Sequence, residues 1–344
     1  KNIVMKINVS VFGEVNGNTV KAFTLNNANG MSVTLLNYGG IIKDITVPNA
    51  EGKPIHCVQT FDTLQEYIDD PSYRSAIVGR YANRIGHGTF CLNGTQYTLD
   101  KNGGEHNLHG GFAGFHKKIW QASTNELDNS ASVTFKLHSP DGEGGFPGNV
   151  KVEACYTLNN DNELSLELSA TTDKETPLSF TQHAYFTLSD DDKVGSTLLH
   201  IDAEQVTDAD SSLLPTGKLV DIGGTPFDFL SLTPIEKRAS QQASHALFDM
   251  VGGYDHNYVL RAAKGSEPQA TVMAPDTGIS MELFTTLPGL QFYTGSLESD
   301  EQLGALCLEP QHFPDAPNKP AFPNCFVKPE ETFKAAIRYK FRAG

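Results

Sequence analysis

The chain has 344 residues, of which 39% are hydrophobic and 19% are charged, a composition typical of a globular protein. It carries 26 Lys and Arg against 41 Asp and Glu, which gives a formal net charge of −15. This acidity argues against nucleic acid or an anionic membrane as a partner, because both require a basic surface. It suits a neutral or cationic small ligand. No apolar run approaches the ~20 residues of a membrane-spanning helix.

The five cysteines are widely spaced and form no CxxC pair, so they predict neither a disulfide framework nor a cysteine-based zinc site. The chain begins at Lys1 rather than at a methionine. We expect a cytoplasmic protein, with a periplasmic or secreted location as the alternative if the missing methionine reflects a removed signal peptide. We expect a monomer or a homodimer.

The predicted elements are mostly strands. A short helix is predicted first, over DTLQEYI, Asp62 to Ile68. Period-two alternation of apolar and polar residues then marks half-buried antiparallel strands. It occurs in SVTFKL (132–137), VKVEACYTL (150–158) and ELSLELSA (163–170).

A second and longer helix is predicted over TPIEKRASQQASHALFDM, residues 233–250. Thr233 supplies the N-cap, Pro234 occupies the first helical position, and Glu236 completes a capping box. The chain ends in another alternating segment, FKAAIRYKFR (333–342), which predicts a final strand.

The overall pattern predicts an all-β protein. Turn residues are plentiful, with 31 Gly and 18 Pro, and we find no linker, internal repeat or low-complexity tract. We therefore predict a single domain over residues 1–344. It is a large antiparallel β-sandwich with few short helices, closed by its C-terminal strand.

Six polar motifs lie beside predicted strands. In chain order they are VGRYANRIGHGTF with Arg80, Asn83 and Arg84, GEHNLHGGFAGFHKKIW with His109, LSFTQHAYFTLS with His183, GGYDHNYVL with Asp255 and His256, PGLQFYTG with Gln291, and LGALCLEPQHFPDAPN with Glu309. Taken singly, each motif also fits a structural role, as a surface arginine, a turn or core histidine, a capping aspartate or a solvated strand end.

Glu309 raises the sharpest question. It directly follows the apolar strand Leu306–Leu308, which Pro310 is expected to end, and no Lys or Arg occurs within nine residues on either side. A carboxylate buried there must be hydrogen-bonded, paired or kept for chemistry. Together with two histidines it supplies an acid and a base for proton transfer near neutral pH. Arg, Asp and Gln side chains suit sugar hydroxyls.

The chain resembles the aldose 1-epimerase, or galactose mutarotase, family in seven motifs that occur in the family's order. These are FDTLQEY, VGRYANRI, LNGTQYTL…NLHGG, TQHAYF, GGYDHNYVL, PGLQFYTG and CLEPQHFPDAPN. The resemblance implies a galactose mutarotase-like β-sandwich and an isomerase that needs no metal or other cofactor. It also implies a free aldohexose such as galactose or glucose as the substrate.

The resemblance further implies roles for individual residues. Glu309 matches the general base, which takes the proton of the C1 hydroxyl, and His183 matches the general acid, which protonates the ring oxygen O5. The ring then opens, the C1–C2 bond rotates, and the other anomer closes. The matched sugar-binding positions are Arg80, Asn83, His109, Asp255 and Gln291.

The chain departs from the family's usual residues at Gln182, Ala184 and Thr187, which leaves the preference between galactose and glucose open. Three alternative functions also stay open. The first is a mutarotase or epimerase of another sugar, such as a hexose 6-phosphate or a pentose. The second is a metalloenzyme with a two-histidine, one-carboxylate site, and the third is a non-catalytic carbohydrate-binding module. The metal ligands would be His109, His183 and Glu309.

Overall fold

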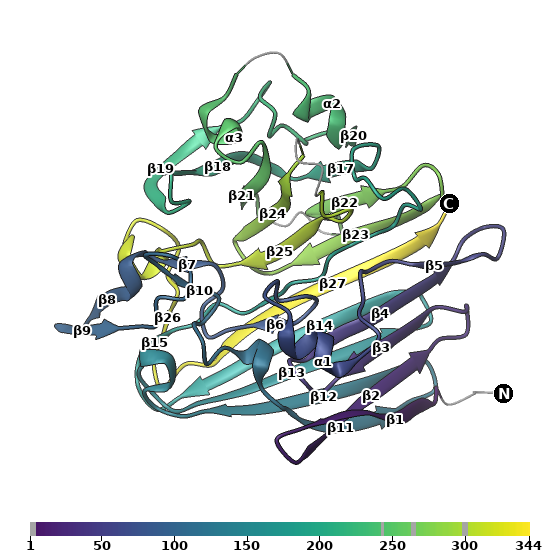
Figure 1. Cartoon of the computed structure of the whole chain (residues 1–344), viewed down its shortest axis with the longest axis horizontal. Helices are drawn as coiled ribbons and strands as arrows, with labels where there is room; N and C mark the ends of the chain where they lie inside the picture. The colour runs from purple at the N-terminus through teal and green to yellow at the C-terminus, as the bar shows by residue number, and fades with distance from the viewer. Residues whose placement is uncertain (1–4, 242–243, 263–265, 298–301) are drawn as a thin grey trace.

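The structure is a computed structural model that describes residues 5–241, 244–262, 266–297 and 302–344. In this part of the chain the fold consists of antiparallel sheets with three short α-helices (Figure 1). The predicted all-β, antiparallel fold class is therefore confirmed. No helix of the described segments is long and apolar enough to cross a membrane.

The largest sheet has nine strands, and its alternating segments are the ones that the sequence predicts. In β14 and β27 buried and more exposed side chains alternate, because one face of the sheet covers the core. The C-terminal strand β27 pairs with β14 and β23 in the middle of the sheet, so the prediction that it closes the sandwich is wrong. The order across the sheet is β11 (Gln121–Glu126), β12 (Ser130–Ser139), β13 (Val150–Asn159), β14 (Glu163–Thr172), β27 (Phe333–Ala343), β23 (Ile279–Thr285), β22 (Ala270–Met273), β17 (Leu198–Ile201) and β20 (Thr233–Pro234).

Two five-stranded sheets pack against the apolar face of the large sheet. The first contains β1 (Ile7–Val15), β2 (Asn18–Asn26), β3 (Ser32–Leu36), β4 (Ile41–Pro48) and β5 (Pro54–His56). The second has the order β19 (Pro215–Asp221), β18 (Ala203–Ala209), β21 (Gly253–Leu260), β24 (Gly289–Ser296) and β25 (Cys307–Gln311). Side chains from all three sheets belong to one continuous hydrophobic core.

There are four two-stranded ladders in the described part of the chain, of which three join segments that are not neighbours in the sequence and the fourth is a hairpin. They bring the segments of Arg84, His109 and His183 toward β25. The pairs are β6 (Ile77–Val78) with β16 (Thr181–Gln182), β7 (Arg84–Ile85) with β10 (Asn107–Leu108), β8 (Thr89–Leu92) with β9 (Thr95–Thr98), and β15 (Thr176–Pro177) with β26 (Phe326–Val327). Single 3₁₀ turns occur at η1 (Gly86–Gly88), η2 (Phe115–Lys117), η3 (Glu143–Gly145) and η4 (Ala316–Asn318).

The helices agree with the sequence only in part. The predicted first helix is present as α1 (Leu64–Asp69), and Thr63 and Glu66 form a capping box at its start. The helix predicted over 233–250 is wrong. Two short helices, α2 (Ile235–Ala239) and α3 (Ala246–Asp249), occur there instead, and residues 242–243 lie outside the described part of the chain.

The start of α2 explains this difference. Thr233 belongs to β20 and pairs with Leu199 of β17, while its hydroxyl donates to the carbonyl of Ser231. Thr233 is thus held in the strand ladder, one residue before the N-cap position of α2. Pro234 becomes the N-cap residue, without a side-chain hydrogen bond. Strand pairing has overridden the local capping signal.

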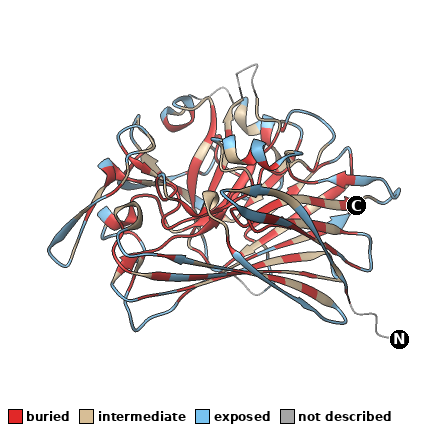
Figure 2. Cartoon of the chain, turned by 60° about the horizontal axis from the view of Figure 1, so that its bottom comes forward, coloured by how far each residue is buried: buried red, intermediate tan, exposed pale blue. Residues whose placement is uncertain are grey.

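The core lies between the layers. Figure 2 shows buried residues along the strands in the interior and exposed residues mainly at the hairpin ends and outer edges. An edge-to-face contact between Phe23 of β2 and Phe135 of β12, with ring centroids 5.9 Å apart, links the first five-stranded sheet to the large one. This rigid base supports the loops that surround the polar cavity described below.

Candidate active site

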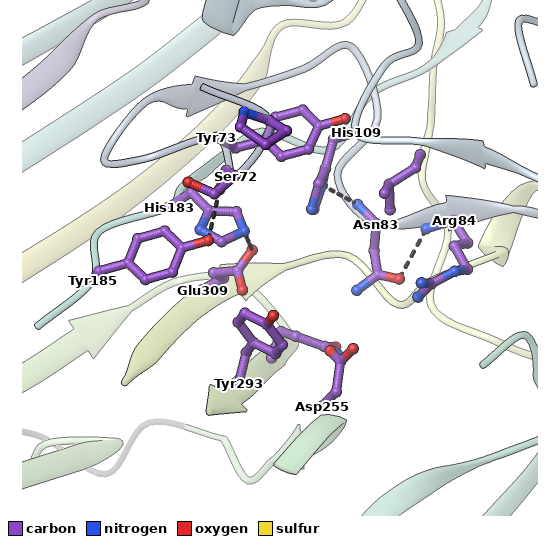
Figure 3. A pocket seen from close by; sticks show the side chains of 13 residues that line it. Ser72, Tyr73, Asn83, Arg84, His109, His183, Tyr185, Asp255, Tyr293 and Glu309 are labelled. Carbon is purple, nitrogen blue, oxygen red and sulfur yellow. Dashed lines mark hydrogen bonds and ion pairs between the residues drawn. The ribbon is translucent and has the colours of Figure 1, made fainter. Parts of the chain in front are cut away.

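A polar cavity of about 310 Å³ opens where the second five-stranded sheet meets the short ladders (Figure 3). Strands β21, β24 and β25 contribute one wall, and the segments around β7, β10 and β16 contribute the other. The lining residues are Pro71, Ser72, Tyr73, Asn83, Arg84, Leu108, His109, His183, Tyr185, Asp255, Gln291, Tyr293 and Glu309.

Glu309 lies inside a strand rather than at its end. Strand β25 continues through Pro310 to Gln311, so the expectation that Pro310 ends the strand is wrong. Proline is tolerated here because β25 is the edge strand of its sheet, where one side of the backbone needs no ladder hydrogen bond. Glu309 is paired in register with Gln291 of β24, so both side chains project from neighbouring strands into the cavity.

Glu309 and His183 form the closest pair of ionisable groups in the cavity. Glu309 Oε1 lies 3.3 Å from His183 Nε2, and the two side chains are only 2% and 6% exposed. Burial raises the pKa of Glu309 well above its usual range, and the negative charge of Asp255 adds to this rise. Burial lowers the pKa of His183 to about 4.

This pair is therefore suited to proton exchange. Glu309 Oε1 has no hydrogen-bond partner within the described segments, although it is fully buried. A buried oxygen without a hydrogen bond is costly in a structural residue and is typical of a reactive one. A carboxyl with a raised pKa is also a stronger base once it has lost its proton.

His109 presents a neutral imidazole to the same space. Its Nδ1 accepts a hydrogen bond of 2.9 Å from the backbone N–H of Asn83, so the ring carries its proton on Nε2. Burial lowers the pKa of His109 well below its usual value, and the nearby His183 and Arg84 act in the same direction. His109 can thus donate a hydrogen bond to a ligand without taking up a proton.

The three groups are also close enough to hold a metal ion. One ligand atom each from His109, His183 and Glu309 lies within 4.8 Å of the other two. Two imidazoles and a carboxylate are a common donor set for divalent transition metals. The geometry therefore fits both a proton-transfer site and a metal site.

Asp255 and Gln291 belong to a network of side-chain hydrogen bonds. Gln291 Nε2 donates to Asp255 Oδ1 at 2.8 Å, and Gln311 Nε2 donates to Gln291 Oε1 at 2.9 Å. Burial raises the pKa of Asp255, whereas Arg84 and the bond from Gln291 act against this rise. The second oxygen, Oδ2, has no hydrogen-bond partner among the described residues and is free to accept one from a ligand.

Arg80 is not among the residues that line the cavity, so the expectation that it lies in the site is corrected. Arg80 is buried, and its guanidinium donates to Ser139 Oγ and to the carbonyls of Ser139, Pro140, Pro147 and Gly148. These bonds fasten the loop between β12 and β13. The arginine that lines the cavity is Arg84, and its guanidinium has no hydrogen-bond partner within the described segments.

Several lining residues are not among those predicted from the sequence. Tyr73 and Ser72 lie in a loop after α1 and belong to none of the polar motifs. Tyr185 and Tyr293 stand inside quoted motifs, two residues from His183 and from Gln291. Period-two alternation places such residues on the same face of an extended segment, and this signal could have identified them.

Comparisons with known proteins agree with this geometry. A family model described as aldose 1-epimerase matches residues 21–340. The galactose mutarotase of Bos taurus is 35% identical over 98% of this chain and 99% of its own length. The aldose 1-epimerase of Escherichia coli K12 is 34% identical over 95% of this chain and 96% of its own length.

Solved structures show the same relationship. The chain is similar to a galactose 1-epimerase from Lactobacillus acidophilus, with a TM-score of 0.86, 26% identity, and coverage of 98% of this chain and 99% of the other. It is also similar to the GalM/aldose epimerase homologue from C. elegans, with a TM-score of 0.83, 30% identity, and coverage of 92% and 97%.

Proposed function

Because the chain belongs to the aldose 1-epimerase family, we propose that it interconverts the α and β anomers of free aldohexoses, galactose and glucose first among them. The reaction is an isomerisation by ring opening and closure. Glu309 is the general base and His183 is the general acid. The observation that carries this assignment is the buried pair itself, with 3.3 Å between Glu309 Oε1 and His183 Nε2.

The proton transfers balance within this pair. In the reactive form Glu309 is a carboxylate and His183 is an imidazolium. Glu309 takes the proton of the C1 hydroxyl while His183 gives its proton to O5, and the C1–O5 bond breaks to leave the open-chain aldehyde. The pair now holds a neutral acid and a neutral imidazole, with the same number of protons. Rotation about C1–C2 and the reverse transfers close the other anomer and restore the pair.

Burial shifts the pKa values of Glu309 and His183 in opposite directions, and this supports a proton exchange with the sugar that can run both ways. Burial raises the pKa of Glu309 and lowers that of His183, so it favours the uncharged pair over the charged one. The uncharged pair is the form that exists with the opened sugar. Each proton-transfer group typically contributes about 10²–10⁴ in rate.

Five side chains are proposed to bind the sugar hydroxyls. Asp255 offers a free carboxylate oxygen, His109 an N–H donor, and Arg84 an unpaired guanidinium. Asn83 and Gln291 supply amides. Arg84 takes the place that the sequence analysis assigned to Arg80.

The charges of the lining favour an unphosphorylated sugar. Among the lining residues, Arg84 is the only one with a permanent positive charge, and Glu309 and Asp255 are both acidic. A phosphate group requires several cationic or N–H donors around it. We therefore favour a free aldohexose over a hexose 6-phosphate.

Polarimetry tests the proposal. Freshly dissolved α-D-galactose and α-D-glucose are followed separately with and without the protein, and at least one is expected to reach optical equilibrium faster with it. Binding of the sugar without faster equilibration would instead identify a non-catalytic carbohydrate-binding module. Acceleration only with a phosphorylated sugar or a pentose would overturn the choice of substrate.

A metal-assisted reaction is the second candidate, carried by the donor atoms of His109, His183 and Glu309 within 4.8 Å. Elemental analysis of the purified protein distinguishes the two. Stoichiometric metal, together with activity that is lost on chelation and restored by the metal, would replace the acid–base proposal. Activity that persists in metal-depleted protein would eliminate the second candidate.

We also propose a cytoplasmic location and a monomer or homodimer. All five cysteines are free thiols, which suits a reducing compartment. Fractionation of the cells that make the protein tests the location. Sedimentation equilibrium tests the oligomeric state.

A further inference from the structure

His183 is held by rings rather than by a second hydrogen bond. Its imidazole is stacked on Tyr185, with centroids 5.2 Å apart and planes at 22°, and on Tyr73, with centroids 6.0 Å apart and planes at 20°. In Figure 3 the His183 ring lies between the two tyrosines. Its Nδ1 is buried and has no hydrogen-bond partner within the described segments.

This arrangement is unusual for a proton-transfer histidine. The second ring nitrogen of such a histidine ordinarily donates to a carboxylate or a carbonyl, which orients the ring and stabilises its charged form. Among the described residues no carboxylate or other side chain serves His183 Nδ1 in this way, yet the proposed reaction requires the ring to be oriented and to become an imidazolium. The faces of aromatic rings attract cations, most strongly at sites without water.

The ionisable and charged groups around His183 provide no simpler explanation. Glu309 faces Nε2, which is the nitrogen that must serve the substrate. The neighbouring His109 and His116 are themselves bases and do not favour a further positive charge. Burial lowers the pKa of His183 and its own backbone raises it, while the farther groups oppose one another, since Asp70 raises this pKa and Arg74 lowers it.

Both tyrosines are held firmly in place. The Tyr185 hydroxyl donates to the carbonyl of Ser72 at 2.6 Å, and the Arg74 guanidinium also lies over the Tyr185 ring, 4.8 Å from its centroid. The Tyr73 hydroxyl accepts from Asn102 at 3.3 Å. The Tyr73 ring also contacts His109, with centroids 4.6 Å apart. The stacking surfaces are thus fixed before any ligand enters.

We propose that Tyr73 and Tyr185 are positioning residues, whose ring faces orient the His183 imidazole. This inference rests on the proposed role of His183 as the general acid. In other proton-transfer histidines an acceptor bound to Nδ1 orients the ring, and here two aromatic ring faces do so. The ring face is therefore the required feature of each tyrosine, and the hydroxyl contributes only to its placement.

The test compares Tyr185→Phe and Tyr73→Phe, which keep the ring, with Tyr185→Leu and Tyr73→Leu, which remove it. In polarimetry the phenylalanine variants should retain kcat within about threefold. The leucine variants should lose at least about tenfold in kcat with a smaller change in KM.

NMR relaxation of the His183 ring in the sugar-free protein separates this inference from the proposed function. The ring should stay rigid in the phenylalanine variants and become more mobile in the leucine variants, whether or not the protein accelerates anomer exchange. Fluorinated phenylalanines at position 185 keep the shape and weaken the negative ring face. They should loosen the His183 ring stepwise even if Tyr185→Leu does not fold.

Three results would overturn the proposal. In the first, the leucine and fluorinated variants hold the His183 ring as firmly and react as fast as the wild type. In the second, the phenylalanine variants lose as much kcat as the leucine variants, which would make the hydroxyl bonds the essential feature. In the third, only KM changes, which would make the tyrosines a surface for the sugar.

Discussion

At the scale of single residues, the central feature is a carboxyl group placed where its charge is unfavourable. Glu309 is 2% exposed, and burial raises its pKa well above the usual range. A group whose folded pKa is raised contributes stability below its unfolded pKa and loses that contribution as pH rises through the folded value. The buried Glu309 carboxyl therefore makes the fold less stable as the pH rises above its unfolded pKa, as is common for groups kept for chemistry.

The first prediction concerns Glu309→Gln, which keeps the shape and removes the proton acceptor. Anomer exchange measured by polarimetry should fall by at least about 10². The melting temperature should exceed that of the wild type at pH 8, and the difference should shrink as pH falls toward about 4.3, the unfolded value. Glu153 forms an exposed ion pair with Lys136, so Glu153→Gln is the matched control. It should change neither the rate of anomer exchange nor the melting temperature. A lower melting temperature of Glu309→Gln at pH 8 would contradict this account.

The second prediction separates the two arginines. Arg84→Gln should raise KM by about 10–100-fold, because the sugar loses a charge-assisted hydrogen bond. The melting temperature of this variant should be nearly unchanged. Arg80→Gln should lower the free energy of unfolding by about 3 kcal/mol or more, because several buried carbonyls lose their donor. Steady-state polarimetry and denaturant unfolding measure the two effects. The reverse pattern would return the sugar-binding role to Arg80.

At the scale of elements, strand β21 connects the cavity to the helix behind it. The backbone N–H of Asp255 donates to His256 Nδ1 at 2.9 Å, and His256 Nε2 donates to the carbonyl of Leu247 in α3 at 2.9 Å. The ring is therefore neutral, with its proton on Nε2. Burial lowers the pKa of His256 to about 4, because a charged ring would be desolvated. A charged ring would also carry a proton on Nδ1, which could then no longer accept the hydrogen bond from the Asp255 N–H.

The third prediction follows from this link. A histidine whose folded pKa is depressed contributes stability above its unfolded pKa of ~6.5, and this contribution is lost as pH falls toward the folded value. Between pH 6 and 5 the wild type should therefore lose more stability than His256→Asn, by about 1.4 kcal/mol per pH unit. Urea unfolding at several pH values measures the slopes. Equal slopes would show that His256 does not titrate in this way.

At the scale of the whole molecule, the sheets share one core. Buried side chains of the first five-stranded sheet, the second five-stranded sheet and the nine-stranded sheet belong to the same cluster. Examples are Phe23 of β2, Phe292 of β24 and Tyr339 of β27. The site is supported by this core and has residues from segments that span most of the chain.

The fourth prediction is the single domain over residues 1–344. A shared core should unfold as one cooperative unit, because exposing one sheet removes the apolar cover of the others. Differential scanning calorimetry should show one transition, coincident with the loss of near-ultraviolet circular dichroism. Two resolved transitions would require the chain to be divided into separate domains.

The sequence by itself determined the features that depend on neighbours in the chain. Alternation predicted β14 and β27, because one face of each strand meets apolar side chains and the other meets water. A capping box predicted α1, because the side chains that accept hydrogen bonds from the first backbone N–H groups of the helix lie within one turn of them in the sequence. The motifs also contained Glu309 and His183, and the resemblance of these motifs to a family, rather than either residue alone, predicted their roles.

Only the tertiary structure decided which of these residues meet. Arg84 lines the cavity and Arg80 does not, because the Arg80 guanidinium is hydrogen-bonded to the loop between β12 and β13. Nothing in the segment VGRYANRI predicts that this distant loop binds one arginine and not the other. Thr233 fails as a helix cap because β17, more than thirty residues earlier in the chain, pairs with it. The stacking of Tyr73 on His183 joins residues 110 positions apart. Such contacts are set by sheet order and register, which arise from burial of the whole chain rather than from any short segment.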